Sequence, residues 1–263
     1  MQQYLTAILR IDTNCIFIEM NNPSSKNVLI LGANSDVAKQ ALLLYAQKGF
    51  HITAASRSIE QLELFVKLTN IDTSRVEICY FDATDFGSHA AFYKSLRYKP
   101  HIVLYAAGYL VNNEDALIQW EAAHQMMNVH YCGAVSIVNL IATDKENHSL
   151  ERIVGLSSLS GVRGRRSNFI YGSTKAAFTQ YLAGLRQYLF KRNIVVNVVI
   201  AGYIRSKMTA RLSLPESLLL EPSFIARAVV NAGNRFVIVP GIKWKIIYTI
   251  LIILPEKIVA RLP

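Results

Sequence analysis

Short apolar runs rich in β-branched residues alternate with longer helical patterns along most of this chain. Seven runs have the character of strands, at 27–32, 51–56, 76–81, 101–107, 152–158, 194–200 and 235–240. Helical patterns lie between them, near 36–49, 58–69, 86–97, 115–143, 168–191 and 222–232. Repeated strand–helix–strand units close a parallel sheet, because parallel neighbours need a crossover connection. We therefore predict one doubly wound α/β domain over residues 26–240, with helices on both faces of about seven strands.

Composition supports one folded domain and indicates which classes of partner fit it. The chain has 263 residues, of which 52% are hydrophobic and 17% charged, enough to bury a single α/β core. The three cysteines, Cys15, Cys79 and Cys132, are far apart, so we expect no disulfide framework, no metal site and a reducing cytoplasm. The net charge of +10 fits a phosphate-bearing substrate, an acidic lipid, an acidic carrier or nucleic acid, or simply a basic surface.

The two ends of the chain fall outside this pattern. Residues 1–25 lack the features of a signal peptide and precede the first strand closely, so we interpret them as a disordered extension or the product of an upstream start. Residues 241–263 form an apolar and basic tail. Its nine apolar residues, 246–254, are too few to cross a bilayer as a helix.

The first predicted strand runs into LGANSDVAK, which leads directly into a helix. A nucleotide pyrophosphate binds at such a turn, because backbone amides and the helix dipole attract anions there. The residues expected to contact a cofactor are Gly32, Asn34, Ser35, Asp36 and Val37. The same segment also fits an ordinary cap, with Ser35 at the N-cap and Asp36 favouring the dipole.

The end of the second predicted strand indicates which cofactor is preferred. NAD-binding chains usually place an acid here for the ribose hydroxyl, whereas this chain has Ser56 and Arg57. A guanidinium recognises the 2′-phosphate of NADPH, so we predict NADP(H), with NAD as the alternative. The alternative is that Arg57 is an ordinary exposed arginine after a strand and contacts no cofactor.

Tyr171 and Lys175 are four residues apart on a predicted helix and therefore share one face. An ammonium beside a phenol stabilises the phenolate and lowers the tyrosine pKa, which makes the tyrosine a usable proton donor for a carbonyl. The pair by itself is common on helix surfaces. Ser158 ends the fifth strand, where its hydroxyl can hold the substrate oxygen beside the phenol, and Asn128 lies in the long helix before that strand.

Together these motifs resemble the short-chain dehydrogenase/reductase family over about residues 26–240. Asn128, Ser158, Tyr171 and Lys175 match its tetrad in type, order and spacing. The resemblance implies a Rossmann-type sheet and assigns Tyr171 as the acid/base. It implies that Ser158 positions the carbonyl, that Lys175 binds the nicotinamide ribose and lowers the Tyr171 pKa, and that the Asn128 carbonyl holds a relay water.

The resemblance assigns further cofactor contacts besides Tyr171 and Lys175. They are Asp82 and Ala83 after the third strand, Ala106, Ala107 and Gly108 after the fourth, and Gly202, Ile204 and Ser206 after the sixth. The chain departs from the family where Asp36 and Ala38 replace two glycines of the first loop and Ala201 replaces a proline. Residues 203–221 are expected to form a mobile lid, whose leucines contact an apolar part of the substrate or pack on the core.

Three arginines, Arg163, Arg165 and Arg166, lie between Ser158 and Tyr171. Both ends of their loop are fixed at the predicted cleft, so we expect them to bind a phosphorylated substrate, or to form a solvated basic turn. In the tail, Trp244 and Tyr248 with neighbouring cations favour contact with an anionic membrane surface through 242–263. The alternative is a tail buried on its own domain or in a dimer.

The arginine segment and the tail resemble one branch of the family, which contains the reductase subunit of an epimerase acting on decaprenylphosphoryl ribose through a 2-keto sugar. This resemblance implies NADPH-dependent reduction of a polyprenyl-phosphate-linked keto-sugar by a homo-oligomer or with an oxidase subunit, in the cytoplasm or peripherally on the inner face of the membrane. The alternatives are a reductase of fatty-acyl or other apolar ketones and a non-catalytic dinucleotide-binding scaffold. We expect no nucleic-acid partner, since no recognition element accompanies the charge.

Overall fold

The computed structural model describes residues 26–210 and 212–261 of the chain. The extension predicted for residues 1–25, which includes Cys15, lies outside the described residues.

Seven parallel strands form one sheet in the order β3-β2-β1-β4-β5-β6-β7. The strand order reverses between β1 and β4, which is where doubly wound sheets bind their ligands. The strands are β1 (Asn27–Leu31), β2 (His51–Ser56), β3 (Val76–Tyr80), β4 (Ile102–Tyr105), β5 (Arg152–Ser158), β6 (Val195–Ala201) and β7 (Val237–Ile238). The predicted fold class is confirmed, although β7 is only two residues long.

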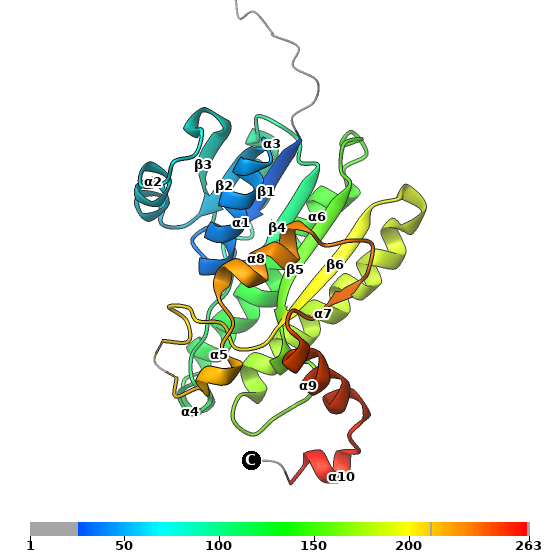
Figure 1. Ribbon diagram of the computed structural model, residues 1–263. Coiled ribbons are helices and arrows are strands. Elements are labelled where there is room, and N and C mark those ends of the chain that lie inside the picture. Colours follow the sequence, from blue (N-terminus) through cyan, green and yellow to red (C-terminus); the bar gives the residue numbers. More distant parts are fainter. Residues whose placement is uncertain (1–25, 211, 262–263) are drawn as a thin grey trace, which may run out of the picture.

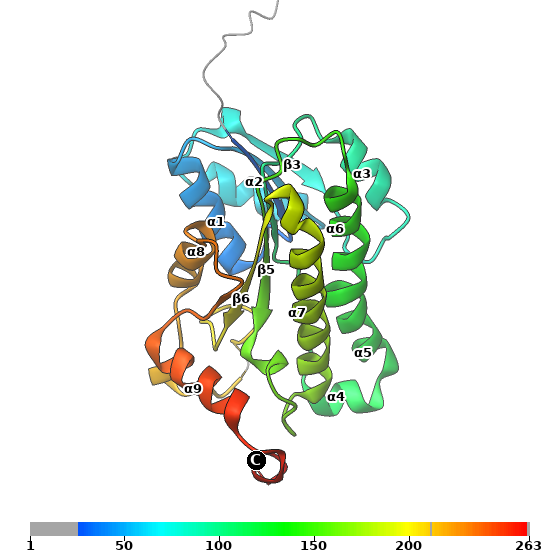
Figure 2. The same cartoon turned by 90° about the vertical axis from the view of Figure 1, so that its right-hand side faces the viewer.

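Helices cover both faces of the sheet (Figures 1 and 2). One face carries α1 (Asp36–Gln47), α2 (Ile59–Lys67) and α8 (Pro222–Val230), and the other carries α3 (His89–Ser95), α6 (Gly133–Thr143) and α7 (Phe169–Leu189). Figure 2 views the sheet nearly edge-on, with α1 and α8 on one side and α6 and α7 on the other. The short helices α4 (Asn113–Ile118) and α5 (Trp120–Met127) lie near the first turns of α7.

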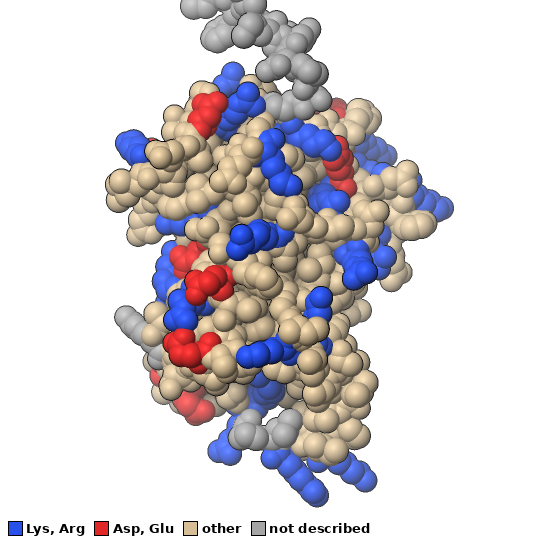
Figure 3. Space-filling model, viewed as in Figure 1, with Lys and Arg blue, Asp and Glu red and all other residues tan. Residues whose placement is uncertain are grey.

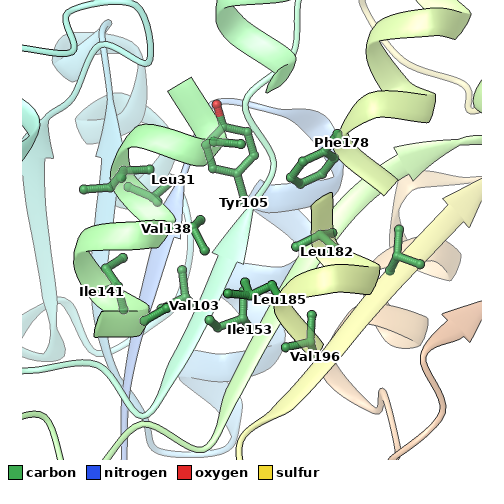
Figure 4. Packing of buried hydrophobic residues seen from close by; sticks show 14 of the residues in the cluster. Leu31, Val103, Tyr105, Val138, Ile141, Ile153, Phe178, Leu182, Leu185 and Val196 are labelled. Atoms are coloured by element: carbon green, nitrogen blue, oxygen red, sulfur yellow. The ribbon is translucent and has the colours of Figure 1, made fainter. Parts of the chain in front are cut away.

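Strand side chains alternate between two hydrophobic clusters, as expected for a sheet buried on both faces. Leu29 and Leu31 of β1 belong to the cluster under α3, α6 and α7, whereas Val28 and Ile30 belong to the cluster under α1 and α8. Figure 4 shows the first cluster, in which Tyr105 of β4 meets Phe178 of α7. This packing fixes α7, the helix of the predicted catalytic pair, against the sheet.

The single helix predicted near 115–143 is wrong in its continuity. Gln119 has an extended backbone between α4 and α5, and a π-helical turn, Asn128–Cys132, separates α5 from α6. The run Trp120–Thr143 is long and apolar enough to cross a membrane, but half of its most apolar window is buried inside the domain. Its apolar character is therefore accounted for by packing on the sheet.

The tail forms α9 (Ile242–Ile253) and α10 (Glu256–Val259), and α9 packs on the domain. Trp244 is buried, stacks edge-on against Tyr203 and donates its indole N–H to the Leu218 carbonyl at 3.0 Å. The expectation that Trp244 faces a membrane is therefore wrong: it anchors the tail to the loop after β6. A Cβ on Gly202 would lie 2.1 Å from the Trp244 ring, so the anchor requires glycine there.

Candidate active site

A pocket of about 880 Å³ opens at the carboxyl ends of the strands. It is lined from β1, β2 and β4 on one side and from β5, α7 and the loop after β6 on the other. Every residue predicted to bind the cofactor lines it: Gly32, Asn34, Ser35, Asp36, Val37, Ser56, Arg57, Asp82, Ala83, Ala106, Ala107, Gly108, Tyr171, Lys175, Gly202, Ile204 and Ser206. The structure thus brings together segments that are up to 174 residues apart, from Gly32 to Ser206.

The first loop has the backbone that a pyrophosphate site needs. Gly32 has φ 83°, and a Cβ there would lie 2.4 Å from the Ala107 nitrogen, so only glycine allows β1 and β4 to approach. Ser35 occupies the N-cap of α1, but its hydroxyl makes no capping bond. The helix N-terminus is therefore not closed by its own side chain, which leaves its amides for an anion.

Asp36, the unexpected carboxylate of the first loop, contacts the lid. Its Oδ2 accepts a hydrogen bond from the Lys207 backbone N–H at 2.8 Å, and the Lys207 ammonium donates to the Asn34 carbonyl at 2.7 Å. These two bonds join the loop after β6 to the loop after β1, across the pocket mouth. The lid is further held by Arg205, which pairs with Glu216 at 2.5 Å and Glu221 at 2.9 Å.

The loop after β2 presents polar and basic groups to the pocket. Ser56, Arg57, Ser58 and Gln61 line this wall, and none of them is acidic. The Asn34 amide donates to the Ser56 hydroxyl at 2.8 Å and to the Ser58 carbonyl at 2.6 Å, which ties the two loops together. The exposed Arg57 is therefore held at the pocket edge by a rigid turn.

Ser158, Tyr171 and Lys175 share the opposite wall. The Lys175 ammonium donates to the Leu156 carbonyl at 3.1 Å and lies 5.9 Å from the centre of the Tyr171 ring. The Ser158 oxygen accepts a bond from the Ser160 N–H at 3.2 Å, so its own proton remains available to another group. Gly172 lets α7 pack closely against the segment after β5, since a Cβ there would lie 2.6 Å from the Ser160 carbonyl oxygen.

Burial controls the charges of this trio. Burial raises the pKa of Tyr171 to about 12, and its hydrogen bond with Ser158 opposes the rise. Burial lowers the pKa of Lys175 to about 8. The expected lowering of the Tyr171 pKa is therefore not found in the protein without cofactor: the phenol is protonated at neutral pH. A protonated phenol beside a hydroxyl and an ammonium suits proton donation to a carbonyl oxygen.

The structure does not bring Asn128 into the pocket. Its side-chain amide bonds instead to His124, one turn earlier, at 3.1 Å. His130 points inward and is fully buried, with its ring edge-on to Tyr171 at 5.2 Å between centroids. Residues two apart on a helical turn point to nearly opposite sides, so only one of this pair faces the catalytic wall. His130 could not be identified from the sequence, because a lone histidine in an apolar helical run does not reveal the direction of its side chain.

The three arginines do not line the pocket. Arg163 donates from Nε to the Leu251 carbonyl and from Nη2 to the Leu254 carbonyl, both at 2.9 Å, and so binds the end of α9. Arg165 donates to the Ser160 hydroxyl at 3.1 Å. Arg166 is exposed beside Ser167 and Asn168, which do line the pocket. The substrate-binding role predicted for the trio thus has no support for Arg163, whose guanidinium binds the tail.

The remaining pocket wall has two characters. Polar side chains cover the side next to Tyr171, and they belong to Asn112, Asn113, Asp115, Ser160, Ser167 and Asn168. Apolar side chains come from the segment after β4 and from the lid, and they belong to Leu110, Val111, Met208, Leu212 and Leu214. A ligand that fills this end therefore meets both hydroxyl-binding groups and hydrocarbon.

Comparisons with known proteins agree with this geometry. The family model described as short chain dehydrogenase matches residues 26–217, well over half of the chain. The chain belongs to the short-chain dehydrogenase family. It is an oxidoreductase of that family.

Individual relatives within the short-chain dehydrogenase family are distant. An uncharacterized oxidoreductase of Mycobacterium tuberculosis is 26% identical over 254 residues, which cover 93% of this chain and all of that protein. Carbonyl reductase family member 4 of Xenopus laevis is 26% identical over 220 residues, covering 78% of this chain and 90% of the relative. A short-chain dehydrogenase of Burkholderia cenocepacia J2315, solved in complex with NADP, superposes with a TM-score of 0.76 at 21% identity, covering 90% and 97%. That likeness shows the fold.

Proposed function

We propose that this protein is an NADPH-dependent reductase that converts the keto group of a phosphorylated, polyprenyl-phosphate-linked sugar to an alcohol. The observation that carries the proposal is the placement of Ser158, Tyr171 and Lys175 in one pocket whose far end combines a polar wall with an apolar lid. The proposal includes a cytoplasmic location, at the inner face of the membrane.

The cofactor proposal rests on the loop after β2. Arg57 stands at the pocket edge and no carboxylate accompanies it, which favours a 2′-phosphate over a ribose hydroxyl. The Gly32 turn and the N-terminus of α1 offer the anion site for the pyrophosphate. The Burkholderia cenocepacia neighbour was solved with NADP, which supports the same choice here.

The substrate proposal rests on the polar and apolar residues that line this end of the pocket. Asn112, Asn113 and Asp115 from α4 and the loop before it, with Ser167 and Asn168, offer donors and acceptors for sugar hydroxyls. Leu212 and Leu214 of the lid offer an apolar surface for a lipid chain. Arg166, exposed beside Ser167, is the arginine best placed to meet a phosphate, while Arg163 and Arg165 are engaged within the protein.

Ser158, Tyr171 and Lys175 have different roles in the proposed reaction. When bound, reduced nicotinamide supplies the hydride that forms the new C–H bond at the carbonyl carbon. The Ser158 hydroxyl donates to the carbonyl oxygen and orients it. Tyr171 then donates its phenolic proton to that oxygen, so the C=O double bond becomes a C–OH single bond. Lys175, charged at neutral pH, stabilises the phenolate that remains.

A substrate comparison tests this function. Purified protein is given NADPH with a polyprenyl-phosphoryl 2-keto-pentose, or with an apolar ketone of the same chain length and no hydroxyls. We expect faster NADPH consumption with the keto-sugar and little with NADH. A preference for the apolar ketone would favour the fatty-acyl alternative, which the leucines of the lid also support. Binding of NADPH without turnover of any ketone would indicate the non-catalytic scaffold.

We further propose that the tail contacts an anionic membrane surface through an isoleucine stripe on α9, defined as Ile242, Ile246, Ile250 and Ile253. All four are exposed, from 46% to 71%, although the opposite face of α9 is packed on the domain. Lys245 and Lys257 are exposed on the same segment, and Figure 3 shows basic side chains projecting at the end of the molecule that carries α10. Apolar groups with flanking cations favour the interface of an anionic bilayer.

Vesicle sedimentation tests the isoleucine stripe. The double variant Ile246→Glu/Ile250→Glu should lose binding to vesicles containing anionic phospholipid, because two charges enter the apolar contact. Leu64→Glu/Leu68→Glu, which places two charges at the same spacing on exposed apolar residues at the end of α2, is the matched control and should bind. Wild-type protein that ignores anionic vesicles, but forms a dimer that the double variant cannot form, would show that a second copy covers the stripe instead.

A further inference from the structure

We propose that His130 is a positioning residue of the reductase centre: held as the neutral Nδ1–H tautomer between the segment after β4 and helix α7, it fixes the backbone and ring of Tyr171. The inference rests on the proposed reductase function for its kinetic consequence. Its structural content, the tautomer and the two bonds of the imidazole, stands separately.

Both ring nitrogens of His130 have buried partners. Nε2 accepts a hydrogen bond from the Tyr109 backbone N–H at 3.0 Å. Nδ1 lies 2.8 Å from the Thr174 hydroxyl oxygen, and that hydroxyl donates its single proton to the Tyr171 carbonyl at 2.8 Å. Because a backbone N–H can only donate, Nε2 must be unprotonated, and because the Thr174 proton is already used, Nδ1 must carry the proton. The bonds therefore determine the tautomer.

The surroundings keep the ring neutral. His130 is fully buried, and a second proton would face the Tyr109 N–H. Burial, and then the charge of Lys175, holds the pKa of His130 well below its usual range. A neutral imidazole with one donor and one acceptor can bridge two backbones, whereas an imidazolium would break the Tyr109 bond.

The bridge reaches one segment from each side of the pocket. Tyr109 follows Gly108, which lines the pocket after β4, and a Cβ on Gly108 would lie 3.9 Å from His130 Nε2. On the other side, the His130 ring stands edge-on to the Tyr171 ring at an interplanar angle of 87°. His130 therefore fixes the spacing between the segment after β4 and the proton donor, Tyr171. Proton and hydride transfer depend steeply on such distances.

The π-helical turn is what directs His130 inward. This turn, Asn128–Cys132, carries one more residue than an α-helical turn, and such turns occur often at functional sites. The Tyr105 hydroxyl of β4 donates to the Val129 carbonyl at 2.5 Å, which holds the turn against the sheet. At the end of the turn, a Cβ on Gly133 would lie 2.0 Å from the Ala83 carbonyl oxygen, so the helix is pressed against the loop after β3. The turn is thus fixed on both sides of His130.

A set of variants separates positioning from bulk packing. His130→Phe keeps a ring but loses both bonds, and we expect kcat to fall by about tenfold to a hundredfold with KM for NADPH nearly unchanged. His130→Asn can still donate to Thr174 and His130→Gln can still accept from Tyr109, so both should retain more activity than His130→Phe. Thr174→Ser, which keeps the hydroxyl, is the control for Thr174→Val, which removes it.

A double-variant cycle tests the path through Thr174. If His130 acts on Tyr171 through that hydroxyl, the pair His130→Phe/Thr174→Val should be little slower than His130→Phe alone. Multiplying losses, or a wild-type kcat in folded His130→Phe, would overturn the positioning role.

Nitrogen NMR of ring-labelled histidine, with His130→Asn used for assignment, reads the tautomer directly at neutral pH. We expect a protonated Nδ1 and an unprotonated Nε2. The opposite tautomer or a doubly protonated ring would overturn the inference even if the reductase proposal holds. The expected tautomer in a protein that turns over no ketone would instead sink the proposed function and leave the structural bridge.

Discussion

The cofactor end and the substrate end of the pocket differ in how their residues are placed. At the cofactor end, Gly32, Ser56 and Ala106 each sit where a parallel strand ends, so the sheet itself brings them to one edge. At the substrate end, placement depends on the direction of side chains on helices and loops. Arg163 turns toward α9 and Asn128 turns toward His124, although both lie close in sequence to pocket residues. The ends of the strands place backbone segments at the pocket. Whether a functional group on a helix or loop enters the pocket depends on the direction of its side chain.

The catalytic trio stands between these ends, and removing its proton donor should have the largest effect. Tyr171→Phe keeps the ring that packs against His130 but loses the hydroxyl. We expect kcat to fall by about a thousandfold, since general acid catalysis contributes on that order. NADPH binding, measured by nicotinamide fluorescence, should stay near wild type. A variant that turns over normally would remove Tyr171 from the chemistry and with it the link between the two ends.

The cofactor end should respond to loss of one guanidinium. Arg57→Ala should weaken NADPH binding by about tenfold to a hundredfold, because a charge-assisted bond to the 2′-phosphate is lost, and should leave NADH binding almost unchanged. Calorimetry with both dinucleotides checks this. Lys67→Ala, exposed on the same helix-bearing segment but outside the pocket, is the matched control. Equal losses for both dinucleotides would show that Arg57 does not read the 2′-phosphate.

Lys175 makes the trio sensitive to alkaline pH. Burial lowers the pKa of Lys175 to about 8, so the ammonium is present below that pH and lost above it. The reductive kcat/KM, which reports free enzyme, should therefore be level below about pH 8 and fall about tenfold per unit above it. Lys175→Arg keeps its charge and should show no inflection there, whatever its rate. A wild-type profile that stays level to pH 10 would contradict this assignment.

At the substrate end, two arginines three residues apart should behave differently. Arg163→Ala removes bonds to the Leu251 and Leu254 carbonyls and should lower the local stability of α9 by about 1–3 kcal/mol, seen as faster hydrogen exchange of the tail. Arg166→Ala should leave exchange unchanged and weaken phosphorylated substrates selectively. Identical behaviour of the two variants would erase the distinction between a tail anchor and a phosphate contact.

The smallest effect is expected at the lid latch, the hydrogen bond that Asp36 accepts from the Lys207 backbone N–H. Asp36→Asn keeps an acceptor for the Lys207 N–H and removes a charge near the bound phosphates. NADPH affinity should rise by about twofold to fourfold, the scale of one screened charge repulsion. Asp36→Ala also loses the latch and should regain less affinity. If Asp36→Asn binds NADPH more weakly than wild type, the carboxylate itself supports cofactor binding.

Residues at the strand ends could be predicted because a parallel sheet turns sequence order into spatial position. The five residues predicted from the run LGANSDVAK line the pocket, as do the predicted residues at the ends of β2, β3 and β4. His130 could not be predicted, because a π-helical turn shifts the helical phase and no pattern in MMNVHYCGA reveals it. The Tyr171 pKa could not be predicted either, because spacing gives the lysine neighbour but not the burial that outweighs it. The contacts of Arg163 and Trp244 with distant segments depend on the folded tail.

Isotope transfer shows whether the protein delivers hydride from NADPH to a keto-sugar. Wild-type protein is incubated with NADPH deuterated at the nicotinamide carbon that donates hydride and with a polyprenyl-phosphoryl 2-keto-pentose, and the product is analysed by mass spectrometry. We expect one deuterium at the former carbonyl carbon for each NADPH consumed. A product without deuterium, or NADPH that stays bound and unconsumed while no alcohol forms, would contradict it.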